Sequence, residues 1–254
     1  MNARRTDHVE GSPRRPLWFT RTTLRKAFAL GGCAICRAVR ASERKGIHSF
    51  LYEGMMSPLV RASFLDAGGF CLRHFWMAKE IEDETWPTGG IGMAILCEDL
   101  VRLVNANLEK LPLAETNPRK GLFHHREGAQ AFVPGHGCPF CRDNAEKERF
   151  LAEVLEELVE EQEFARPLSR NGLCARHGQM TLRCWKDQGK RQELFLSLKV
   201  QATQLAADLR EFIRKHDYQY RSEPGGPEQD SVLRAIHLLA GIRQCKEETM
   251  KERR

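Results

Sequence analysis

The sequence predicts an all-α protein built from two homologous helical units, each stapled by a metal site of three cysteines and one histidine. Apolar residues recur at steps of three and four over most of the chain, which is the period of an amphipathic helix. Glycines and prolines separate these stretches, and no segment alternates as a half-buried strand does. Four short cysteine and histidine motifs, in two matching couples, predict the metal sites.

The first half of the chain is predicted to contain a flexible basic arm and five helices. The arm, residues 1–16, is rich in arginine and proline and has few apolar side chains. Within residues 17–30 a short helix is expected to run from Thr22 or Thr23 to Leu30, and further helices are expected at residues 37–56, 58–67, 71–86 and 91–111. Thr22 or Thr23 is the expected cap of the first helix. Ser57 suits the N-cap of the third, and Pro58 suits its first helical position.

The second half is predicted to repeat this order after a linker. Residues 112–137 contain prolines and glycines without helical periodicity, which is typical of a linker. Further helices are expected after Cys141, from Cys174, at 192–216 and at 231–244, followed by a charged tail at 245–254. A short segment at residues 164–170 is expected to lead into the turn at Asn171 and Gly172. The metal-binding repeats are therefore expected at residues 17–111 and 138–244. A stripe in the 192–216 helix is expected to face the core: Phe195, Leu198, Ala202, Leu205, Leu209 and Phe212.

Composition narrows the class of protein. Neither a signal-peptide pattern nor a run of about 18 apolar residues is present, so the sequence predicts a cytoplasmic protein without a membrane span. Nine cysteines in a reducing compartment favour metal binding over disulfides. The net charge of +6 is spread along the chain and gives no strong signal for duplex DNA. A protein partner and RNA both remain open.

Eight residues are the candidate metal ligands. They are Cys33, Cys36, Cys71, His74, Cys138, Cys141, Cys174 and His177. Each half contains a C-x2-C motif followed by a C-x2-H motif, which together make a complete four-ligand set. The prediction therefore groups the ligands by half, with the first four around one ion and the last four around another. Each motif lies where a helix is expected to begin, and helix N-termini stabilise thiolates.

Three thiolates and one imidazole fill the tetrahedral shell of zinc, which predicts two structural zinc ions. An iron-sulfur cluster, or a thiol-based redox, electron-transfer or sensor role, remains an alternative for the same cysteines. No phosphate-binding loop, zinc-hydrolase motif or nucleophile motif is present, so an interaction or regulatory protein is favoured over an enzyme. The pattern assigns no role to Cys97, Cys184 and Cys245.

Other polar residues near the motifs have two interpretations. Arginines accompany the ligands in both halves: Arg37, Arg73, Arg142 and Arg176. They are either donors to the thiolates or ordinary surface arginines, and the sequence leaves both open. Three linker histidines, His124, His125 and His136, are expected to be solvated.

The chain resembles an uncharacterised bacterial family with duplicated C-P-x-C and G-x-C-x-x-H motifs. The resemblance covers residues 25–242 and depends on these motifs, on Lys215-His216-Asp217-Tyr218 and on the segment from Asp230 to Gly241. The family's function is unknown, so the resemblance supports the boundaries and the ligand set and implies nothing about biochemistry. The first repeat departs from C-P-x-C in having Ala34 where the second has Pro139.

Overall fold

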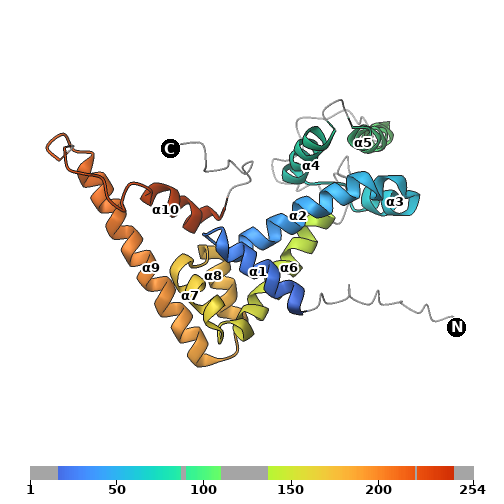
Figure 1. Cartoon of the computed structure of the whole chain (residues 1–254). Helices are drawn as coiled ribbons and strands as arrows, with labels where there is room; N and C mark the ends of the chain where they lie inside the picture. Colours follow the sequence, from blue (N-terminus) through green and yellow to red (C-terminus); the bar gives the residue numbers. More distant parts are fainter. Residues whose placement is uncertain (1–16, 87–89, 110–136, 221, 243–254) are drawn as a thin grey trace, which may run out of the picture. The chain divides into compact units, whose positions relative to one another are not determined.

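The computed structural model describes residues 17–86, 90–109, 137–220 and 222–242, and these are helical without a strand (Figure 1). The helices are α1 (Leu17–Ala29), α2 (Ala34–Tyr52), the 3-10 helix η1 (Gly54–Met56), α3 (Pro58–Asp66), α4 (Leu72–Thr85), α5 (Gly92–Glu109), α6 (Pro139–Leu158), α7 (Gln162–Asn171), α8 (Ala175–Cys184), α9 (Gln188–Lys215) and α10 (Ser231–Ala240). The all-α prediction is confirmed. No helix among these residues is long and apolar enough to cross a bilayer.

Several predicted features lie outside the described residues. They are the arm at residues 1–16, the linker apart from Gly137, the tail at 245–254 with Cys245, and the histidines His124, His125 and His136.

The described residues pack into two compact units. Unit 1 contains the residues up to Ala38 and those from Arg149 onward, and unit 2 runs from Val39 to Glu148. The chain passes from one unit to the other within α2 and again within α6. These units are defined by packing, and the sequence repeats at residues 17–111 and 138–244 stay a prediction.

In unit 1, α1 packs against α7, α7 and α8 pack against α9, and α10 packs against α8 and α9 (Figure 1). Phe28 of α1 meets the fully buried Phe164 of α7 with ring centroids 6.4 Å apart. The indole N–H of buried Trp185 donates to the carbonyl of Ala152 at 2.8 Å. Because an unpaired buried polar group is costly, this bond fixes the turn after α8 against α6.

In unit 2, phenylalanines form the centre of the core. Phe50 of α2 contacts Phe64 of α3 at a centroid distance of 4.5 Å, and Phe64 contacts Phe70 at 4.7 Å. Phe140 joins them, 5.4 Å from Phe70. Since Phe70 precedes Cys71 and Phe140 lies between Cys138 and Cys141, this burial also positions two ligand motifs.

Three expected helix ends can be compared with the structure. Ser57 accepts the N–H of Val60, so it is the N-cap of α3, as predicted. The threonine cap of the first helix is wrong, because α1 already begins at Leu17 and the hydroxyls of Thr22 and Thr23 donate to carbonyls one turn earlier. The last helix ends at Ala240 rather than at residue 244, because Gly241 adopts a φ of +74° that a helix cannot continue.

The predicted core stripe of α9 is wrong for much of its length. Leu205 is buried, but Phe195 is 48% exposed and Ala202 is exposed. The reason is length: α9 has 28 residues, about 42 Å, whereas α7, α8 and α10 have 10 residues each. These short helices cover only parts of its surface.

Candidate metal centres

All four ligand motifs form the first turn of a helix in the same way. The first cysteine of each motif directly precedes the helix, and the second ligand is its third residue. These pairs are Cys33 and Cys36 at α2, Cys71 and His74 at α4, Cys138 and Cys141 at α6, and Cys174 and His177 at α8. Side chains at the N-cap and the third helical position project to the same side of the helix start, where unpaired backbone N–H groups favour thiolate. Each motif therefore places two candidate ligands side by side at a helix N-terminus.

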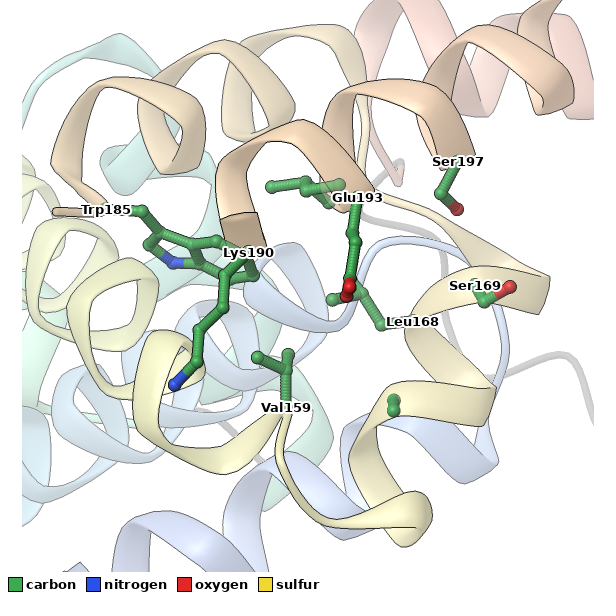
Figure 2. Close-up of a pocket in the computed structure, with 9 residues that line it drawn as sticks. Val159, Leu168, Ser169, Trp185, Lys190, Glu193 and Ser197 are labelled. Atoms are coloured by element: carbon green, nitrogen blue, oxygen red, sulfur yellow. The ribbon is translucent and has the colours of Figure 1, made fainter. Parts of the chain in front are cut away.

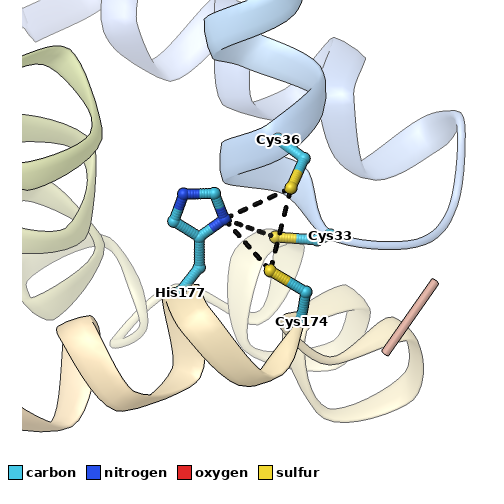
Figure 3. A group of neighbouring side chains, drawn as sticks. All are labelled: Cys33, Cys36, Cys174 and His177. Atoms are coloured by element: carbon cyan, nitrogen blue, oxygen red, sulfur yellow. Dashed lines mark hydrogen bonds between the residues drawn. The ribbon is translucent and has the colours of Figure 1, made fainter. Parts of the chain in front are cut away.

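Cluster 1, in unit 1, consists of Cys33, Cys36, Cys174 and His177, whose donor atoms lie within 4.8 Å of one another (Figure 3). The Nδ1 atom of His177 is 3.4 Å from Cys33 Sγ, 3.2 Å from Cys36 Sγ and 3.2 Å from Cys174 Sγ. The Sγ atoms of Cys36 and Cys174 are 3.8 Å apart. Except for the half-buried Cys36, all of these side chains are buried.

Cluster 2, in unit 2, consists of Cys71, His74, Cys138 and Cys141, again with donor atoms within 4.8 Å of one another. The Nδ1 atom of His74 is 3.1 Å from Cys71 Sγ, 3.2 Å from Cys138 Sγ and 3.5 Å from Cys141 Sγ. The Sγ atoms of Cys71 and Cys141 are 3.6 Å apart. Cluster 2 is the more accessible of the two, because Cys141 is exposed and Cys71 is half-buried.

The structure brings together all eight predicted ligands but corrects their grouping. Each cluster takes its C-x2-C motif from one half of the sequence and its C-x2-H motif from the other. The grouping by half, with Cys33, Cys36, Cys71 and His74 in one site and Cys138, Cys141, Cys174 and His177 in the other, is wrong. In cluster 2, His74 is instead hydrogen-bonded to Glu43 of α2.

The imidazole of His74 contacts a buried carboxylate through the ring nitrogen that faces away from the cysteines. Its Nε2 atom lies 2.5 Å from Oε1 of Glu43, and both side chains are almost completely buried. The same oxygen accepts hydrogen bonds from Arg73 and from the amide of Asn144. Among the proposed arginine donors, Arg73 therefore binds a carboxylate, and Arg37 donates to the carbonyls of Leu30 and Gly31.

Hydrogen bonds within the clusters shift the pKa values of their donors. Burial lowers the pKa of His74, but its hydrogen bonds with Cys138 and Glu43 outweigh burial and raise that pKa to about 10. Burial raises the pKa of Cys138, whereas hydrogen bonds from His74 and from backbone amides bring it down to about 6. Hydrogen bonds from Cys33 and Cys36 lower the pKa of Cys174. Each cluster thus favours at least one thiolate.

Sequence reasoning missed two residues that shape these centres. Glu43 could have been found from spacing, since a glutamate follows the C-x2-C motif by seven residues in both halves, at Glu43 and at Glu148, which is also buried. Gly241 had no such signal. An added Cβ at Gly241 would lie 3.1 Å from Cys36 Sγ and 3.9 Å from Cys174 Sγ, so its backbone closely covers cluster 1.

Two of the cavities in unit 1 differ in their size and in the residues that line them. One, of about 230 Å³, is lined by residues including Trp185, Lys190 and Glu193 (Figure 2), and the Lys190 ammonium in it is already paired with Glu160. The other, of about 420 Å³, lies against Cys33 and Cys174 beneath α10. The lining of the second cavity also includes Arg170 and, from α10, Arg234 and His237. Cys97 and Cys184 belong to neither cluster.

Comparison with known proteins adds a family and no function. Searches of curated proteins and of solved structures found no match. A model of a family of unknown function, DUF6062, matches residues 23–246, a span that contains all eight clustered ligands. The chain therefore belongs to the family of unknown function DUF6062.

Proposed function

We propose that this protein binds two structural zinc ions and acts in the cytoplasm as a non-enzymatic interaction or regulatory protein. The observation that carries the proposal is the donor spacing in both clusters. A tetrahedral zinc site with Zn–S bonds of about 2.3 Å has S–S edges of about 3.8 Å and S–N edges of about 3.5 Å. The S–S distances of 3.8 and 3.6 Å and the S–N distances of 3.1 to 3.5 Å are close to these edges.

The donor set supports a structural role for the metal. Three thiolates and one imidazole complete a four-coordinate shell and leave no position for a water nucleophile. Each set also joins two helix N-termini that are far apart in sequence: 138 residues separate Cys36 from Cys174, and 64 separate His74 from Cys138. Metal binding would hold these helix starts together, so its free energy would contribute directly to folding.

The distances between the donor atoms also argue against a four-iron cluster. In a four-iron cluster each cysteine binds a different iron, so its sulfurs lie farther apart than the ligands of one ion. Donor atoms that all lie within 4.8 Å of one another favour a single ion over such a cluster. Single iron and zinc ions accept similar geometry, and metal analysis distinguishes them.

An interaction role is supported by exposed apolar side chains on α10. The exposed residues are Val232, Leu233, Ile236 and Leu239, and Leu239 is 76% exposed. Contiguous exposed apolar groups of this kind often mark contact surfaces.

The proposal is tested by the metal content of the purified native protein. We expect two zinc ions per chain, no acid-labile sulfide and no visible absorption. Stoichiometric iron with sulfide would replace the proposal by the redox alternative. Full folding and thermal stability after verified removal of all metal would refute the structural role.

A further inference from the structure

The carboxylate of Glu43 is the meeting point of three polar groups beside cluster 2. Its Oε1 atom accepts hydrogen bonds from His74 on α4, from Arg73 next to it and from Asn144 on α6. Glu43 itself comes from α2 and is 1% exposed. Burying a carboxylate is costly unless it is hydrogen-bonded and its charge is balanced, so this arrangement requires its donors to stay in place.

The contact with His74 decides which ring nitrogen faces the cysteines. A neutral imidazole carries one N–H and one lone pair. The Nε2 atom lies 2.5 Å from the Glu43 carboxylate and 3.1 Å from Nη2 of Arg73. Because the contact with the carboxylate is the shorter one, the N–H belongs on Nε2 and the lone pair on Nδ1. The Nδ1 atom lies 3.1 to 3.5 Å from all three sulfurs of cluster 2, which is where an ion would lie.

We infer that Glu43 is the positioning residue of cluster 2: it holds His74 in the Nε2–H tautomer and aims Nδ1 at the metal. The inference rests on the proposed function, because it assigns Glu43 a task in binding the ion. Carboxylate–histidine–metal arrangements of this kind fix ring orientation and increase the basicity of the ligand.

Asn144 and Arg73 give Glu43 its own position and charge balance. Asn144 lies on α6 three residues after Cys141, so the helix that provides two thiolates also orients the carboxylate. Arg73, adjacent to His74, places a guanidinium on the same oxygen. Zinc with three thiolates carries a net charge of −1, and the carboxylate adds another negative charge. The arginine offsets this addition.

The test compares Glu43→Gln with a matched control in the full-length zinc protein. Glutamine keeps the size and a carbonyl acceptor but removes the charge. Glu82 is a suitable control because it is also a buried carboxylate of unit 2, it accepts the N–H of Met93, and it is no part of the cluster. We expect Glu43→Gln to weaken zinc binding at cluster 2 by about 10- to 100-fold in chelator competition. Cluster 1, and both clusters in Glu82→Gln, should keep wild-type affinity.

A second readout separates positioning from general stability. Nitrogen-15 NMR of the zinc-loaded wild type should show one histidine tautomer at His74, with an Nε2–H that exchanges slowly with solvent. Glu43→Ala should accelerate this exchange, whereas Glu82→Gln should leave it unchanged. If Glu43→Ala does not fold, Glu43→Gln is measured in the same way.

The possible failures are distinguishable. A wild-type protein without zinc would overturn the proposed function itself. A wild-type protein with two zinc ions, together with a Glu43→Gln variant that binds zinc as tightly as Glu82→Gln and keeps its protected Nε2–H, would overturn only the role of Glu43.

Discussion

A cysteine occupies the position where helices usually have serine, threonine, aspartate or asparagine. Cys71 and Cys174 are the N-caps of α4 and α8, and neither side chain makes the usual capping hydrogen bond. A thiolate at this position receives the field of the helix N-terminus and remains available to a metal. At the scale of single residues, the chemistry of the site is thus a modified helix cap, repeated at four helix starts.

Zinc binding at cluster 2 should depend on pH in a defined direction. Before metal binds, His74 holds its proton up to a pKa of about 10, whereas Cys138, with a pKa of about 6, is already a thiolate at neutral pH. Zinc must displace the proton on His74, so raising the pH should favour binding. We expect apparent affinity to increase as the pH rises through the pKa of Cys138, about 6, and on toward that of His74, about 10, with proton release detected by calorimetry in buffers of different ionisation enthalpy. Affinity that is independent of pH would contradict this view.

At the scale of elements, glycine turns set the entry of the chain into the clusters. Gly31 and Gly32 lead into α2 with φ values of +70° and +67°, and Gly241 ends α10 with a φ of +74° beside Cys36. Side chains are strained in this region of backbone space, and at Gly241 a side chain would also approach sulfur. The end of α10 is therefore part of the wall of cluster 1.

Substitution of these glycines by alanine separates backbone strain from contact with the cluster. Gly31→Ala places its Cβ in open space, whereas Gly241→Ala places it 3.1 Å from Cys36 Sγ. Both should lower the free energy of unfolding by about 1–3 kcal/mol through backbone strain. Only Gly241→Ala should also reduce zinc retention at cluster 1. The check is thermal denaturation together with zinc content, and equal zinc retention in the two variants would show that the contact is unimportant.

At the scale of the whole molecule, the eight residues that form the two clusters were predictable from sequence and their grouping was not. The spacing within a motif is a local property: Cys71 and His74 lie on one helix turn wherever that helix packs. Which two motifs lie together depends on tertiary packing, and the spacing within a motif does not contain that information. The ends of the two helices that precede Gly31 and Gly68 were predicted to within one residue. The exposed stretch of α9 around Phe195 was not predicted, because periodicity cannot tell how much of a long helix its neighbours cover.

The two clusters should differ in how fast they lose metal. Cys141 in cluster 2 is exposed, whereas cluster 1 has three buried ligands and only Cys36 half-buried. A chelator reaches exposed thiolates more easily, so zinc release should occur in two phases, with cluster 2 first. A Cys141→Ser variant should lose the faster phase. If it loses the slower phase instead, accessibility does not govern release.

The two motifs of cluster 2 lie between the two motifs of cluster 1 in the sequence, which is a nested arrangement. The zinc content of two double variants tests this arrangement. Cys36→Ser with Cys174→Ser alters two ligands of cluster 1, whereas Cys36→Ser with Cys71→Ser alters one ligand in each cluster. We predict that the first variant keeps one zinc ion per chain, bound as tightly as in the wild type, and that the second keeps none at that affinity. If the first keeps no zinc while the second keeps one tightly bound ion, the ligands are grouped by half and the nested arrangement is contradicted.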